Sequence, residues 1–264
     1  MMPKAGLRTG MVLRVDPGAV VGGRSADGWV IASARSLTAW LATSALVTAA
    51  LVATASPAEA IDATWLSTPG SGTYAAGSNW SGGSVPDGTA SFGASTITNL
   101  SILSTQSVGG WTFNADAGNY VIDGEVSLRF LGAGIVVNGG SVVLDINVSG
   151  VRFGNNSTAG TATINVNDST LSFTQSATAG SATIRSDSEI SFKNTSTAGN
   201  AGISNTRRVY FDDASTAGNA TITNTGRGTI YFHGASSGGT RASSTTPKST
   251  CRTACFPSSR WGRS

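Results

Sequence analysis

The sequence predicts an all-β fold, a single-stranded parallel β-helix (a solenoid) of about seven coils, because residues 153–239 repeat one pattern at a period near twenty. Successive copies begin at Phe153, Phe173, Phe192, Phe211 and Phe232, so the periods are 20, 19, 19 and 21 residues. Next to each Phe, apolar and polar residues alternate, as in Leu171-Ser172-Phe173, which is typical of a strand with one buried face. The repeats show no helical spacing of apolar residues.

Each copy has the same internal order after its Phe. A Gly follows seven residues later in every copy, and in the four complete copies an Ala and an Ile lie two and four residues beyond it, as in Gly199, Ala201 and Ile203. The variation in length falls after the Ile, so one turn differs between copies. Stacked coils place each residue about 4.8 Å from its equivalent. Burying one Phe contributes roughly 1.5–3 kcal/mol, but a single coil has nothing to bury it against. The recurrent Gly is expected at a corner with positive φ.

Residues 1–60 read as a signal or leader peptide that engages the export machinery. Five basic residues precede an apolar run over residues 37–55, and Ala58-Glu59-Ala60 has the small-x-small form of a cleavage site. The alternative is an uncleaved membrane anchor, since the run is about long enough to span a bilayer.

The net charge of +3 does not indicate a nucleic-acid-binding protein. Residues 61–239 carry seven basic and eleven acidic side chains, a net charge of −4, whereas residues 240–264 carry five basic and no acidic ones. The basic character belongs to the two ends of the chain, so no nucleic-acid partner is expected.

Residues 61–93 are interpreted as an N-terminal cap, and residues 94–152 as degenerate coils of the same solenoid. An uncovered sheet edge invites aggregation, so the end unit of a solenoid is atypical. Trp65 and Trp80 are expected to cover the first coil, with an aromatic platform for sugars as the alternative. Among the degenerate coils, Trp111-Thr112-Phe113 and residues 126–130, 135–137 and 142–146 read as strands, with Gly118 and Gly139-Gly140 as turns.

The repeat stops at Gly239, and residues 240–264 read as an aberrant, disordered tail. Neither the Ala nor the Ile of a next copy follows, and both cysteines, Cys251 and Cys255, lie here. We interpret this change of composition as a shifted reading frame or a truncated gene. Two cysteines without a nearby His do not form a zinc site, so no metal or cofactor is expected.

No convincing catalytic set is present, and the prediction is that the protein is not an enzyme. The one histidine, His233, could pair with Asp212 or Asp213 and one of many serines, but no nucleophile-elbow motif supports a triad. Asp212 and Asp213 are expected to point to opposite faces of a strand. Three further acids, Asp168, Asp187 and Glu189, are expected in the variable turn.

The chain resembles the passenger segment of a bacterial autotransporter-type surface protein. The residues that carry this resemblance are the leader ending at Ala60, the entry Asn79-Trp80-Ser81-Gly82-Gly83-Ser84-Val85-Pro86 with residues 89–93, and the repeated Ser-Thr-Ala-Gly-Asn-Ala-Thr-Ile of residues 215–222. The resemblance implies a right-handed β-helix, export and a C-terminal β-barrel that anchors the protein in the outer membrane. This sequence has no set of alternating ten-residue strands that could form such a barrel.

The expected function is therefore a non-catalytic, secreted or cell-surface stalk. It would bind surface glycans or proteins of host or neighbouring cells through weak multivalent contacts, with repeated Thr, Ser and Asn displayed on the coil exteriors. The alternatives are a polysaccharide-active β-helix enzyme, which would need insertions between coils, and a non-functional, frameshifted gene fragment.

Overall fold

The computed structural model describes residues 23–25, 28–30, 59–226, 228–239 and 250–251. The chain divides into two units, residues 1–58 and 59–264. In the first unit, β1 (Gly23–Ser25) and β2 (Gly28–Val30) pair as an antiparallel hairpin. The apolar run at residues 37–55 lies outside the described residues, and no helix in the described part is long and apolar enough to cross a membrane.

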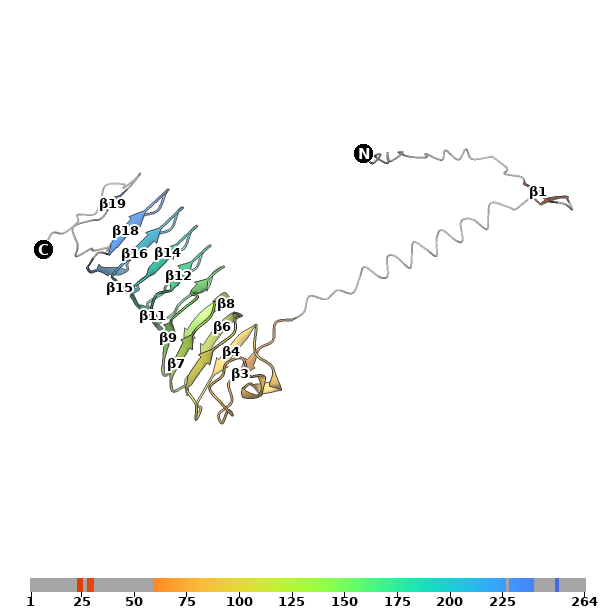
Figure 1. Cartoon of the computed structure of the whole chain (residues 1–264), viewed down its shortest axis with the longest axis horizontal. Helices are drawn as coiled ribbons and strands as arrows, with labels where there is room; N and C mark the ends of the chain where they lie inside the picture. The colour runs from red at the N-terminus through yellow and green to blue at the C-terminus, as the bar shows by residue number, and fades with distance from the viewer. Residues whose placement is uncertain (1–22, 26–27, 31–58, 227, 240–249, 252–264) are drawn as a thin grey trace, which may run out of the picture. The chain divides into compact units, whose positions relative to one another are not determined.

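The second unit is a parallel β-solenoid, as the period predicts, and Figure 1 shows its strands stacked in chain order. A ten-stranded sheet, here called the Phe sheet, contains β3 (Ala63–Thr64), β4 (Thr89–Phe92), β6 (Gln106–Phe113), β8 (Leu128–Val137), β10 (Val151–Phe153), β12 (Thr170–Phe173), β14 (Glu189–Phe192), β16 (Arg208–Phe211), β18 (Thr229–Phe232) and β19 (Thr250–Cys251).

A seven-stranded sheet, here called the Ile sheet, contains β5 (Asn99–Ile102), β7 (Asn119–Gly124), β9 (Ser141–Ile146), β11 (Thr163–Val166), β13 (Thr183–Ser186), β15 (Gly202–Asn205) and β17 (Thr221–Asn224). One strand of each sheet makes a coil, so β4 to β17 form about seven coils.

The phenylalanines form the continuous inner column that the repeat predicts. Phe130, Phe153, Phe173, Phe192 and Phe211 are fully buried, and their rings stack on successive coils with centroids 4.7–4.9 Å apart, while Phe232 continues the stack at 5.0 Å. The Ala and Ile positions of the complete repeats are also buried. The prediction of a core built from stacked equivalent residues is therefore confirmed.

The recurrent Gly lies at a corner with positive φ, as expected. Gly160, Gly180, Gly199, Gly218 and Gly239 all have φ of 60–62°. Two residues before each of the first four, a Thr hydroxyl accepts a hydrogen bond from the Gly N–H at 2.9–3.1 Å. These threonines, Thr158, Thr178, Thr197 and Thr216, also bridge neighbouring coils through their backbones. Their hydroxyls therefore hold the corner together.

One set of repeat serines is buried instead of displayed, whereas Ser176 and Ser204 are exposed as expected. Ser157, Ser196, Ser215 and Ser236 are buried, and the hydroxyls of Ser196 and Ser215 donate to the carbonyl oxygens of Phe173 and Phe192 at 3.2 and 3.1 Å. The residue two positions after Phe has positive φ, as in Asn194, so the strand has ended there and the turn sets the inward direction of the serine.

The cap covers the edges of both sheets at the N-terminal end. β3 pairs with β4 in the Phe sheet, and Thr73 bridges Ser101 of β5 in the Ile sheet. Trp65 and Trp80 are each only 2% exposed and lie edge-to-face, with ring centroids 5.1 Å apart. Rings buried to this extent cover the core and leave no face for a sugar. Two short 3-10 turns, Gly77–Asn79 and Ser81–Gly83, complete the cap.

Three boundaries differ from the sequence interpretation. Thr89–Phe92, assigned to the cap, is the first strand of the first coil. Residues 126–130 and 135–137, expected as two strands, contribute to one long strand, β8. Within the expected tail, β19 pairs in parallel with β18, so that Cys251 stands in register with Phe232. The rest of the tail, with Cys255, lies outside the described residues.

Candidate functional site

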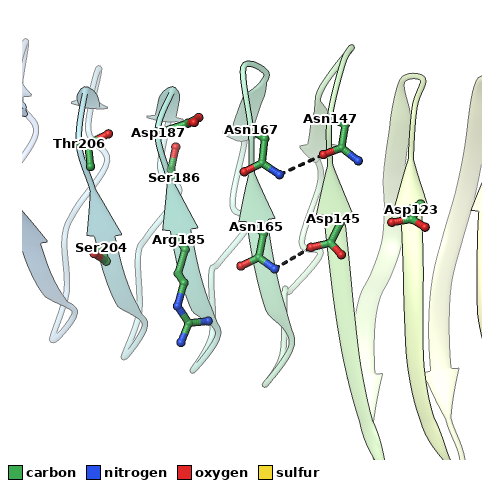
Figure 2. Close-up of a pocket in the computed structure, with 10 residues that line it drawn as sticks. All are labelled: Asp123, Asp145, Asn147, Asn165, Asn167, Arg185, Ser186, Asp187, Ser204 and Thr206. Atoms are coloured by element: carbon green, nitrogen blue, oxygen red, sulfur yellow. Dashed lines mark hydrogen bonds between the residues drawn. The ribbon is translucent and has the colours of Figure 1, made fainter.

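A shallow polar groove of about 540 Å³ runs over the outer face of the Ile sheet. Five consecutive strands, β7 to β15, contribute to it, and Figure 2 shows their side chains in rows along the solenoid. We call this set the polar groove; it is lined by Asp123, Asp145, Asn147, Asn165, Asn167, Arg185, Ser186, Asp187, Ser204 and Thr206.

Nine of the ten lining residues occupy two columns, and the tenth, Ser186, is one of the buried residues that lie between the columns and fix the register. Each first-column residue directly follows a buried aliphatic residue, as Asn165 follows Ile164, and the backbone register aligns Asp123, Asp145, Asn165, Arg185 and Ser204. The second column stands two positions further along the chain and contains Asn147, Asn167, Asp187 and Thr206. Strand alternation turns both columns outward.

Hydrogen bonds between neighbouring coils hold part of each column. Asn165 donates from Nδ2 to Asp145 Oδ1 at 2.6 Å, and Asn167 donates from Nδ2 to Asn147 Oδ1 at 3.0 Å (Figure 2). Asp187 Oδ1 accepts the backbone N–H of Asp168 at 3.1 Å. These bonds fix the orientation of the side-chain amides, which leaves their remaining polar atoms directed outward.

The acidic end of the groove holds two carboxylates in adjacent coils. Burial raises the pKa of Asp123, and the negative charges of Asp145 and Glu125 raise it further. In the described residues Asp123 has no protein hydrogen-bond donor to offset this repulsion. The end formed by β7 and β9 is therefore the part of the groove where an additional negative charge is least favourable.

His233 and its acidic neighbours lie on the other sheet. His233 Nδ1 is 2.7 Å from Asp212 Oδ1, and the imidazole ring lies beside Tyr210 and Tyr231, with centroids 6.1 and 5.8 Å away. No serine hydroxyl bonds to the imidazole within the described part of the chain. The arrangement is a surface pair without the nucleophile of a triad.

Asp212 and Asp213 do not point to opposite faces of a strand, and that expectation is wrong. Both follow the end of β16 in a turn, and Asp213 has a φ of 60°. Asp212 contacts His233 of the next coil, whereas Asp213 Oδ2 accepts the backbone N–H of Asn194 of the previous coil at 2.7 Å. Each carboxylate serves a different neighbour, so they do not form a catalytic pair.

The remaining predicted acids are distributed over the surface. Asp168 lies in the turn between the sheets, Asp187 lines the groove, and Glu189 begins β14. Among the described residues, no group of three or more His, Cys, Asp or Glu could hold a metal ion.

The groove was not identified from the sequence, although a signal for it exists. In each coil the residue after the buried aliphatic residue of the Ile sheet is polar, and a fixed register places these residues in one column. Reading that position down the repeats would have found Asp145, Asn165, Arg185 and Ser204.

Comparison of the chain with protein-family models, with curated proteins and with solved structures gives no match.

Proposed function

We propose that the chain is a non-catalytic, exported stalk, a structural or adhesive passenger segment of the autotransporter type that is presented outside the cell or at a bacterial surface. The observation that supports this most is the continuity of its columns. Between Phe153 and Phe232 every coil takes 19 to 21 residues, and the phenylalanine rings stack without a break.

A uniform shaft favours a structural or adhesive role because catalytic sites need concave walls that exclude water. In a β-solenoid such walls come from long insertions between coils. The coils of residues 153–239 have none, and the polar groove is shallow and open to solvent. This surface favours the presentation of repeated side chains over the enclosure of a substrate.

A polysaccharide-active enzyme is the second candidate, and the pair Asp123 and Asp145 favours it. Glycosidases use two carboxyl groups whose environments separate their pKa values, and burial together with nearby negative charge raises the pKa of Asp123. Against this role, Asp145 already accepts a hydrogen bond from Asn165, and no wall covers the pair.

Export can be tested with residues 1–264 expressed in a bacterium and carrying an epitope tag inserted at Gly226. This exposed turn has a φ of 64°, and a side chain there would have open space. The expected result is loss of residues 1–60 and recovery of the tag outside the cytoplasm, in the periplasm, in the medium or on intact cells. Ala58→Arg with Ala60→Arg is the control and should abolish processing, because both small cleavage-site residues are removed.

Retention of the unprocessed chain in the cytoplasm would refute the export proposal. If the purified chain cleaves pectins or glucans and Asp123→Asn loses this activity, the stalk proposal is rejected in favour of the enzyme. The same screen with Asp212→Asn tests whether the Asp212–His233 pair contributes.

A further inference from the structure

The polar groove has the geometry of a site for a long, straight ligand. Its lining residues come from five adjacent parallel strands, each about 4.8 Å from the next, so equivalent side chains recur over a length of about 19 Å. The two columns follow the solenoid axis side by side (Figure 2). A ligand that contacts all five coils must extend along the axis and offer polar groups at a similar repeat distance.

The chemistry of the lining matches hydroxyl groups. Planar amides and carboxylates, hydroxyls and one guanidinium supply hydrogen-bond donors and acceptors in close alternation, and no aromatic residue lines the groove. In the described residues the Arg185 guanidinium makes no hydrogen bond or ion pair. The bonds of Asn165 and Asn167 to the preceding coil use one side-chain nitrogen each and leave both carbonyl oxygens available.

The charge of the groove argues against an acidic ligand. Asp123, Asp145 and Asp187 face a single cation, Arg185, so the lining has an excess of negative charge. A polyanion would place its charges beside Asp123 and Asp145, at the end where carboxylates already repel one another. An uncharged polymer avoids this cost and still uses the same hydrogen-bonding groups.

The groove is also ordered before a ligand arrives. Its floor is the backbone of the Ile sheet, with fully buried residues such as Leu144, Ile164 and Ile184 beneath it. Most lining side chains are short, so little rotamer entropy is lost when they are fixed. The binding energies of weak individual contacts can therefore add up along the two columns.

We propose that the polar groove binds a linear, uncharged polysaccharide lying along the solenoid axis. The inference rests on the proposed adhesive function and names its ligand class. Each sugar unit would meet one coil, with its hydroxyl groups bonded to the amides of Asn165 and Asn167 and to the guanidinium of Arg185. The open groove implies weak binding to one protein molecule, strengthened where many copies meet one polymer.

The test uses the purified full chain and titrates it calorimetrically with defined oligomers of β-1,4-glucan, β-1,4-mannan and β-1,4-xylan, two to eight units long. At least one series should bind, with affinity that rises with length and levels off at about four or five units, the number that spans the groove. Oligogalacturonates of equal length should bind at least about tenfold more weakly, because they are anionic.

Two groove variants and a matched control assign the site. Asn165→Ala and Asn167→Ala should each weaken binding by about 3- to 10-fold, the loss typical of one or two hydrogen bonds. Asn200→Ala removes an exposed Asn at the turn before β15, outside the groove, and should leave affinity unchanged. Unchanged circular dichroism spectra verify that all three variants remain folded.

Several outcomes would overturn the inference. These are no binding of any neutral series, affinity that ignores length, equal losses in Asn200→Ala, or binding of oligolysine in place of the glycans, which would identify the groove as a site for basic peptides. If the chain is displayed on cells but binds no glycan, the ligand class is wrong and the stalk proposal stands. If glycans bind but the chain stays in the cytoplasm, the stalk proposal fails instead.

Discussion

The recurrent glycine corner makes a prediction in which two substitutions in one coil have opposite effects. Gly199 has a φ of 61°, and a Cβ there would lie 2.7 Å from the carbonyl oxygen of Gly180 and 3.0 Å from Thr178 Oγ1. Gly202, three residues later, is exposed at the start of β15 and has open space around the same position. Comparing substitutions at Gly199 and Gly202 separates the need for Gly at the corner from the general effect of replacing a Gly.

The expected magnitudes follow from the geometry. In Gly199→Ala, the left-handed backbone costs about 1–2 kcal/mol and forcing the coils apart about 1–3 kcal/mol, so the free energy of unfolding should fall by roughly 2–5 kcal/mol. Gly199→Val should be at least as severe, because a branched side chain is larger at the point of contact. Gly202→Ala should instead raise the free energy of unfolding by up to about 1 kcal/mol, since Ala restricts the unfolded chain.

Urea unfolding of the purified full chain, followed by circular dichroism, measures the difference. With a slope of about 2 kcal/mol per molar urea, Gly199→Ala should move the midpoint down by about 1–2.5 M and Gly202→Ala slightly up. A loss below about 1 kcal/mol in Gly199→Ala, or equal shifts in both variants, would refute the stacked corner.

Three further predictions concern the columns. Phe192→Ala, in the middle of the ring stack, should lower the free energy of unfolding by about 3–5 kcal/mol. Phe232→Ala should lower it by less, because among the described residues Phe232 stacks on one Phe ring and Phe192 on two; equal urea midpoints would contradict this. Thr197→Val should cost about 0.5–1.5 kcal/mol through the lost hydrogen bond to Gly199, while Thr197→Ser should retain most of it in thermal unfolding. Asp123→Asn should stabilise the chain at pH 7 by about 0.2–1 kcal/mol. Because the folded pKa of Asp123 is raised, the native charge repulsion is relieved as the pH falls through that pKa, so the gain should vanish in acid; a constant gain across the pH range would exclude the charge explanation.

Most of the fold could be predicted from the repeats because equivalent positions in successive coils hold the same residue and stack on one another. The Phe, Gly, Ala and Ile positions could be assigned from spacing alone, since a residue that recurs in one place is packed against its copies. The buried polar residues could not. Asn205 is fully buried at the end of β15, where it follows Ile203 by two positions, but in the sequence it resembles a turn residue. Alternation continued by one step would have placed it inward.

The site was harder to predict than the fold because its residues differ from coil to coil. The residues of one column, such as Asp145, Asn165, Arg185 and Ser204, occupy equivalent positions in successive coils but have four different side chains. A search for repeated residues therefore does not detect the column. The column forms because the buried residues fix the strand register. The side chains in the column point outward, so core packing does not restrict which residues they are. Variation at an outward position flanked by two buried positions is thus the pattern to seek in solenoids of this kind.

The same columns explain why the first coils look degenerate. One inward position holds Trp111, then Ile135, then Ala159 and further alanines, and a neighbouring one passes from Tyr120 through Val142 to Ala162. The side chains that fill this corner therefore shrink away from the cap, and the strands β6 and β8, of 8 and 10 residues, give way to strands of 3 or 4. The turns that contain Gly160, Gly180, Gly199 and Gly218 occur in the coils where this corner is filled by Ala. A repeat becomes visible in the sequence where the volume of the core stops changing, which is why the period begins at Phe153 although the solenoid begins at β4.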